Sequence, residues 1–155
     1  MRSADSWFSE YSENHRNATN IAIHWVCVPA IFFSVIGLLG SIPPDRLPWL
    51  GQVPWAKVAV ALALAFFYVR LSVGIAVGMA IAGYACLVVV RWLDWHAPWP
   101  LWAISLMIFA AAWVGQFYGH KVEGKKPSFL KDLAFLLVGP AWLLAKTYKR
   151  IGIPY

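Results

Sequence analysis

The chain has 155 residues, of which 61% are apolar and 13% are charged, and its formal net charge is +6. Its mean hydropathy is +0.62, whereas a soluble domain is nearer half apolar and a quarter charged. This composition excludes an ordinary soluble domain and predicts an integral membrane protein in which residues 1–155 form a single domain. The two cysteines lie in separate apolar runs without a CxxC spacing, so neither a disulfide framework nor a thiolate metal site is indicated.

Four apolar runs follow a polar N-terminal segment. They cover residues 21–39, 53–69, 71–90 and 101–118. Each run is near the ~20 residues that a helix needs to cross a hydrocarbon core of ~30 Å. Only Arg70 separates the second run from the third, so we expect either a tight hairpin at Arg70 or helix boundaries a few residues away.

A last apolar stretch, 133–145, is too short to cross a membrane. It contains Gly139-Pro140, and a proline inside a helix removes a hydrogen bond and kinks or breaks the helix. We therefore expect a re-entrant or interfacial segment that is broken at Pro140. The predicted fold class is all-α: an integral membrane bundle of about four transmembrane helices plus a short C-terminal re-entrant or interfacial helix.

Lysine and arginine residues indicate the orientation of such a bundle, because they accumulate on the cytoplasmic side. With four crossings, the side of the N-terminus holds Arg2, Arg16, Arg70, Lys121, Lys125, Lys126, Lys131, Lys146, Lys149 and Arg150. The other side holds Arg46, Lys57 and Arg91. Both termini are therefore predicted to be cytoplasmic, in a bacterial inner membrane or the endoplasmic reticulum, unless the last stretch also crosses, which would cancel the asymmetry. The basic residues suit anionic lipid headgroups, and they show no nucleic-acid-binding pattern.

The predicted topology sorts the four histidines. His15 precedes the first run, His24 lies about one turn inside it and His120 ends the fourth run, so all three fall at the cytoplasmic face. His96 lies in the loop on the opposite face, roughly a membrane thickness away. Three imidazoles can therefore converge, whereas the fourth cannot.

His15 and His24 are nine residues apart, which would place them on opposite faces of an unbroken helix. Both reach one site only if the chain breaks or turns between them, and Thr19 or Asn20 is a suitable N-cap for the second helix. Asn20 shares a helical face with His24. It is either a partner that orients the imidazole or a hydrogen-bond donor between helices.

A stripe of polar side chains ends the fourth run. Gln116, His120 and Glu123 are spaced by four and three residues, so they line one face of a helix. Imidazole and carboxylate groups bind metals and transfer protons, and near hydrocarbon they need partners. This stripe is the leading candidate for the working site, where Glu123 would reach a metal, hold a ligand imidazole, or remain a surface carboxylate. Gly115 and Gly119 form a GxxxG pair, which predicts close helix packing.

Three patterns in the chain are similar to those of a known family. They are His15-x4-Asn20-x3-His24 with Pro29, Gln116-x2-Gly119-His120-x2-Glu123 with Pro127, and Leu136-x2-Gly139-Pro140. They resemble the family of the yeast 2-hydroxy fatty acid dioxygenase, a group of small membrane proteins, and the similarity covers nearly the whole chain. The resemblance implies an Fe(II)-dependent α-oxidation in which a 2-hydroxy fatty acid and O₂ give a fatty acid one carbon shorter.

The resemblance also implies roles for individual residues. The implied metal ligands are His15, His24 and His120. The expected catalytic residues are Glu123, Gln116 and Asn20. A basic residue at the cytoplasmic face, Lys121 or Lys125, would pair with the substrate carboxylate, while the acyl tail lies among the helices or in membrane lipid.

The ligand chemistry leaves alternatives open. Imidazole and carboxylate ligands hold Fe(II) with positions free for O₂ and a bidentate substrate, but the same ligands would bind zinc equally well. One alternative is a zinc-dependent lipid hydrolase. Another is a non-enzymatic helical membrane protein whose polar cluster stabilises the bundle or binds lipid. No flavin, haem-attachment, Rossmann or P-loop motif is present.

Overall fold

The computed structural model describes residues 3–43, 54–126 and 134–155, and the regular structure in these residues is entirely helical. The helices are α1 (Ala4–Glu13), α2 (Ala18–Gly40), α3 (Trp55–Ala63), α4 (Val69–Leu71), α5 (Val73–His96), α6 (Leu101–Glu123) and α7 (Phe135–Ile151). A π-helical segment, Leu64–Tyr68, joins α3 to α4. The prediction of an all-α fold is therefore confirmed for the described residues. Pro127 and the charged residues Arg2, Arg46 and Lys131, which entered the predictions, lie outside them.

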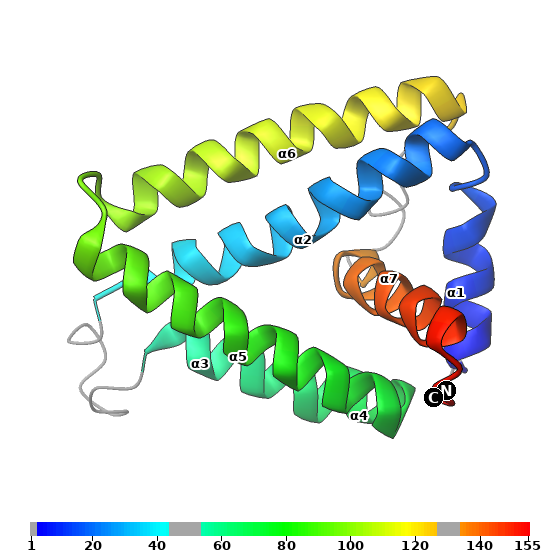
Figure 1. The fold of residues 1–155 in the computed structure, drawn as a ribbon, viewed down its shortest axis with the longest axis horizontal. Helices are drawn as coiled ribbons and strands as arrows, with labels where there is room; N and C mark the ends of the chain where they lie inside the picture. Colours follow the sequence, from blue (N-terminus) through cyan, green and yellow to red (C-terminus); the bar gives the residue numbers. More distant parts are fainter. Residues whose placement is uncertain (1–2, 44–53, 127–133) are drawn as a thin grey trace.

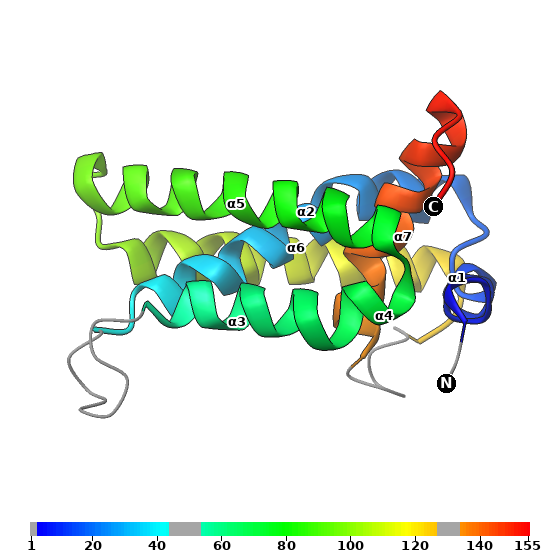
Figure 2. The same cartoon turned by 90° about the horizontal axis from the view of Figure 1, so that it is seen from below.

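The long helices run up and down beside one another. In Figure 1, α2, the α3–α4 pair, α5 and α6 lie lengthwise with alternating chain direction, while α1, α7 and both ends of the chain gather at one end. The view from below agrees with this arrangement (Figure 2). We call the end with α1 and α7 the histidine end. The start of α2, which carries His24, and the end of α6, which carries His120, both lie there.

Among the described residues, three helices are long and apolar enough to cross a membrane, namely α2, α5 and α6. The prediction of about four such helices is therefore corrected to three. The second apolar run does not form one long α-helix, because α3 has 9 residues and a π-helical segment of 5 residues follows it. Within that segment Tyr68 is 1% exposed, and its hydroxyl donates to the carbonyl of Leu137 at 3.1 Å.

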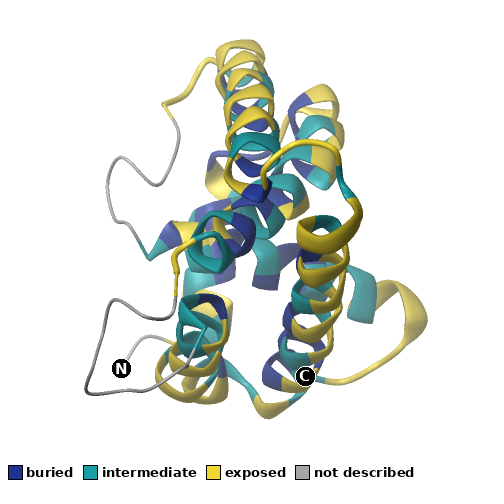
Figure 3. Ribbon diagram, turned by 90° about the vertical axis from the view of Figure 1, so that its left-hand side faces the viewer, coloured by how far each residue is buried: buried dark blue, intermediate teal, exposed yellow. Residues whose placement is uncertain are grey.

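The outward faces of the long helices are apolar. Figure 3 shows buried positions facing the interior of the bundle and exposed positions facing out. On α5 the exposed positions include Val73, Val77, Ile81, Tyr84 and Val88. A stripe of large exposed apolar side chains along a long helix is unusual on a soluble protein and fits contact with lipid.

The turn between the second and third runs lies two residues after Arg70. Ser72 has an extended backbone, with φ −170° and ψ 142°, and separates α4 from α5. Its side-chain oxygen accepts the N–H of Ile75 at 3.5 Å, which caps the start of α5. The tight hairpin is thus present, with its boundary shifted from the predicted position.

Helix α7 continues through Pro140, so the predicted break at this proline is wrong. Pro140 lies in the second turn, where the missing N–H leaves only the carbonyl of Leu136 without its helical donor. The packing of the helix compensates, because Val138, Ala141 and Trp142 join the buried core that also contains residues of α1. With 17 residues, α7 is not among the helices that are long and apolar enough to cross a membrane.

Glycine residues bring α2 and α6 into close contact. A Cβ atom on Gly119 would lie 2.4 Å from the Oδ1 atom of Asn20, and one on Gly115 would lie 2.6 Å from the Sγ atom of Cys27. Both glycines are therefore required for the observed spacing, as the GxxxG prediction expects. The close approach sets the polar start of α2 against the polar end of α6.

Candidate metal centre

Three histidines from distant parts of the chain meet at the histidine end. His15 comes from the loop between α1 and α2, His24 from the second turn of α2, and His120 from the last turn of α6. All three side chains are buried, with exposed fractions of 4%, 1% and 4%. One nitrogen from each ring lies within 4.8 Å of the others. His96 instead ends α5, at the opposite end of the bundle (Figure 1). Its exposed ring stacks on Trp92.

The chain break that the two N-terminal histidines require is present between α1 and α2. Residues 14–17 are not helical, and Asn17 is the N-cap of α2. Its side-chain oxygen accepts the N–H of Thr19 at 2.9 Å and that of Asn20 at 3.4 Å. The prediction of Thr19 or Asn20 as the cap is therefore wrong, because the helix already begins at Ala18.

Hydrogen bonds to backbone carbonyls fix the tautomers of two rings. The Nδ1 atom of His15 contacts the carbonyl oxygen of Tyr11 at 2.5 Å, and the Nδ1 atom of His24 contacts that of Asn20 at 2.9 Å. Because a carbonyl only accepts, each Nδ1 carries the proton, and each Nε2 of a neutral ring presents a lone pair. These two Nε2 atoms face each other at 2.9 Å.

At neutral pH no proton bridges the two facing Nε2 atoms. Burial, followed by the charge of His24, lowers the pKa of His15 from its ordinary value of 6.5 to about 3. The ring is therefore neutral, and two acceptors at this distance repel unless a cation lies between them. Metal-bound imidazole in the Nδ1-protonated tautomer, with a carbonyl holding Nδ1–H, is a recurring arrangement in metal proteins.

The spacing and the unsatisfied atoms fit a metal ion. Two imidazole nitrogens bound to one ion at about 2.1 Å each would be about 3.0 Å apart at a right angle and about 3.4 Å apart at a tetrahedral angle. The observed 2.9 Å matches the smaller value. The Nδ1 atom of His120 is buried without a hydrogen-bond partner in the described parts of the chain. The three histidines together could therefore hold a metal ion.

Glu123 contacts the loop that carries His15. Its two carboxylate oxygens accept the backbone N–H groups of Arg16 at 3.0 Å and Asn17 at 2.9 Å, and the side-chain amide of Asn20 at 3.0 Å. No hydrogen bond joins Glu123 to an imidazole in the described residues. The carboxylate also lies at the N-terminus of α2, where the helix dipole favours a negative charge.

Asn20 and Gln116 lie on either side of His24. The Asn20 side chain is fully buried, and its amide also donates to the carbonyl of Asn14 at 3.3 Å. Its backbone carbonyl holds the ring of His24, so Asn20 links that ring to Glu123. Gln116 is 6% exposed, lies one turn before His120 and is close to His24.

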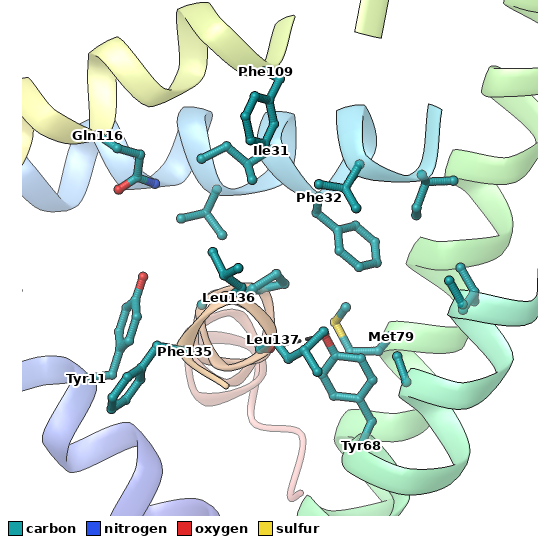
Figure 4. Close-up of a pocket in the computed structure, with 18 of the residues that line it drawn as sticks. Tyr11, Ile31, Phe32, Tyr68, Met79, Phe109, Gln116, Phe135, Leu136 and Leu137 are labelled. Carbon is teal, nitrogen blue, oxygen red and sulfur yellow. Dashed lines mark hydrogen bonds between the residues drawn. The ribbon is translucent and has the colours of Figure 1, made fainter. Parts of the chain in front are cut away.

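An apolar cavity of about 430 Å³ leads away from the histidines. Tyr11, His15, Gln116 and His120 line its polar end. Along α6 the lining extends from His120 to Phe109, which at ~1.5 Å rise per residue is about 16 Å. The walls beyond the polar end are aliphatic and aromatic, with Phe32, Met79 and Leu137 among them (Figure 4).

The structure adds one polar residue and places two lysines away from the cavity. Tyr11 at the polar end is absent from the sequence predictions, and its position four residues before His15 was the one available signal. Burial raises the pKa of its phenol, which keeps the hydroxyl protonated. Lys125 donates to the backbone carbonyl of Glu13 at 2.7 Å, and Lys121 is exposed. Neither lysine lines the cavity.

The family described as 2-hydroxy-palmitic acid dioxygenase Mpo1-like matches residues 1–151. The chain belongs to this family, which confirms the resemblance based on the histidine and glutamate patterns. The family description names a dioxygenase and a 2-hydroxy fatty acid. No curated protein and no solved structure matches the chain.

Proposed function

We propose that this member of the Mpo1-like family is an Fe(II)-dependent dioxygenase that shortens a 2-hydroxy fatty acid by one carbon. The observation that carries the proposal is the pair of facing Nε2 atoms of His15 and His24, 2.9 Å apart, with His120 beside them. The family description supports the reaction class, and the buried imidazoles support a metal in that reaction.

His15, His24 and His120 would hold the iron. Bound Fe(II) with few protein ligands supplies open positions for O₂ and for the hydroxyl and carboxylate oxygens of a 2-hydroxy acid. The protein contributes burial, because the three rings are at most 4% exposed and water is largely excluded around them. It also contributes tautomer control, through the carbonyls of Tyr11 and Asn20.

The overall reaction balances with O₂ as the sole oxidant. One molecule of a 2-hydroxy acid, RCH(OH)COOH, reacts with one O₂ to give RCOOH, CO₂ and H₂O, and all atoms are accounted for. The bond between C1 and C2 breaks, C2 becomes the new carboxyl carbon, and C1 leaves as CO₂. No external reductant is required, which agrees with a chain that lacks flavin and nicotinamide motifs.

The apolar cavity would receive the acyl chain. Its polar end meets the histidines, and its lining extends for about 16 Å along α6 into an apolar interior. Each buried methylene contributes about 0.8 kcal/mol, so this cavity favours long-chain acids over short ones. Gln116 is placed to contact the substrate, while Glu123 and Asn20 position the histidines through the contacts described above.

The membrane orientation is part of the proposal. The apolar outer faces of α2, α5 and α6 would contact lipid, with the histidine end and both termini on the cytoplasmic side of a bacterial inner membrane or the endoplasmic reticulum. A lipid-derived acid then reaches the cavity from the membrane, with its carboxylate near the cytoplasmic surface.

Metal analysis of the purified protein tests the proposal against its alternatives. We expect close to one iron per chain after purification under reducing, oxygen-free conditions, and O₂ consumption when 2-hydroxypalmitate is added. Stoichiometric zinc with release of a lipid acid or amine would favour a hydrolase. Absence of any bound metal would favour a structural role for the polar cluster.

A further inference from the structure

The hydroxyl group of a largely buried tyrosine projects into the polar end of the cavity. Tyr11 is 5% exposed, and its ring stacks on that of His15, with centroids 4.1 Å apart and planes at 11°. The rings of Phe135 and Trp142 pack against it from α7. These contacts fix the phenol ring, and Figure 4 shows its hydroxyl pointing into the cavity, with the Gln116 amide projecting from the other side.

None of the described residues is a hydrogen-bond partner of this hydroxyl. It makes no hydrogen bond within the described residues, yet it stays accessible to the cavity. A Cβ atom on Gly139 would lie 3.1 Å from the Tyr11 oxygen, so the glycine leaves room beside the hydroxyl. The hydroxyl can therefore donate to a ligand in the cavity that carries an acceptor oxygen.

The second phenol of the lining and the two lysines near the site are engaged or lie elsewhere. Tyr68, the second phenol in the lining, donates to the carbonyl of Leu137. Lys125 donates to the carbonyl of Glu13, and Lys121 is exposed outside the lining. Tyr11 is therefore the available hydroxyl donor at the polar end, within the described lining.

We propose that the Tyr11 hydroxyl donates a hydrogen bond to the carboxylate of a fatty acid in the cavity, an inference that rests on the proposed function. A carboxylate has about four acceptor sites, so one oxygen accepts from Tyr11 while the remaining oxygens of the 2-hydroxy acid face the histidines. Hydrogen bonds to an ionised acceptor are short and strong. Because the Tyr11 ring stacks on His15, this bond fixes the substrate head relative to the metal ligands.

Tyr11→Phe tests this assignment, because it keeps the ring contacts and removes only the hydroxyl. The matched control is Tyr84→Phe, which removes the hydroxyl of a residue that is 70% exposed on α5. Dissociation constants for 2-hydroxypalmitate and hexadecan-1-ol would be measured anaerobically on iron-loaded protein in detergent, with iron content in parallel. We expect Tyr11→Phe to bind 2-hydroxypalmitate about 10- to 100-fold more weakly, with unchanged iron content and a smaller loss of affinity for hexadecan-1-ol, whose neutral hydroxyl accepts a weaker hydrogen bond. Tyr84→Phe should match the wild type in all three measurements.

A second variant fills the space beside the Tyr11 hydroxyl. Gly139→Ala places a methyl group against the Tyr11 oxygen, so it should weaken binding of the acid more than binding of the alcohol. If wild type and Tyr11→Phe bound the acid equally well, the proposed role of Tyr11 would be overturned. The proposed function would still stand if the wild type shortened the acid. A wild type that neither prefers the acid over the alcohol nor shortens it would overturn both. Loss of iron in Tyr11→Phe would assign the hydroxyl to the architecture of the site and overturn the substrate contact.

Discussion

The carboxylate of Glu123 accepts the backbone N–H of Asn17 at 2.9 Å, although the two residues are 106 positions apart. This contact ties the last residue of α6 to the N-cap of α2. His120 lies one turn before Glu123, and His15 lies two residues before Asn17, so a single carboxylate joins the segments that carry all three histidines. We infer that Glu123 acts on the metal through the position of His15.

Glu123→Gln tests this positioning role. The variant keeps the shape of the side chain, but it removes the charge and turns an N–H donor towards backbone donors. We expect iron affinity to fall about 10–100-fold, as for other residues that hold metal ligands in place. Competition with a metal chelator measures the affinity. Asp94→Asn, which changes an exposed carboxylate near the far end of α5, is the control. Wild-type iron affinity in Glu123→Gln would contradict the inference.

Replacement of single histidines tests the composition of the centre. His15→Ala, His24→Ala and His120→Ala should each lose bound iron and activity, because each removes a buried ligand atom. His96→Ala should keep both, since its exposed ring lies at the opposite end of the bundle. Iron quantification in the four purified variants gives the answer. Iron loss in His96→Ala together with iron retention in His120→Ala would refute the site.

The stability of the metal-free protein should fall in acid. The pKa of His15 is lowered to about 3 by burial and then by His24. Below about pH 6.5 His15 binds a proton in the unfolded chain, whereas in the folded chain it binds one only when the pH falls to about 3. The contribution of His15 to the free energy of unfolding is therefore fully present above pH 6.5. It is lost as the pH falls towards 3, by up to about 1.4 kcal/mol per pH unit.

Denaturation midpoints of the metal-free wild type and of His15→Gln, measured at several values between pH 7 and pH 4, check this dependence. We expect a steeper decline for the wild type than for the variant. Parallel curves would show that His15 titrates alike in the folded and unfolded chains.

Membrane orientation can be checked by labelling of single cysteines in intact cells. In a background with Cys27 and Cys86 replaced by serine, cysteines at Ser72 and Lys125 should resist an impermeant thiol reagent. A cysteine at Trp99, in the loop at the far end, should react. Permeabilised cells should label all three sites. Reaction at Lys125 and protection at Trp99 would place the histidine end outside the cytoplasm.

The convergence of the histidines could be predicted from the sequence, because it depends only on the alternating direction of apolar runs. The requirement for a break between His15 and His24 was equally local in origin. The position of the N-cap of α2 could not be predicted from the sequence, because Asn17, Thr19 and Asn20 are all acceptable caps. The choice depends on where Glu123 holds the loop. The role of Glu123 was left open for the same reason.

Contacts between distant elements also explain the errors in the helices. The second run contains a π-helical segment where Tyr68 meets Leu137 of α7, a contact that periodicity does not encode. Pro140 does not end its helix, because it lies near the start and the core packing of Trp142 and Val138 holds the remaining turns. The cavity is built mainly from apolar residues of α2, α3, the π-helical segment, α5, α6 and α7, and in the sequence these cannot be told apart from ordinary core residues.

Mass spectrometry of the products formed from 2-hydroxypalmitate, Fe(II) and O₂ tests the central claim most directly. The account predicts pentadecanoate, with one CO₂ released and one O₂ consumed for each molecule formed, and no product from His120→Ala. Absence of pentadecanoate from the iron-loaded wild type, or equal formation by His120→Ala, would contradict a dioxygenase that works at the three histidines.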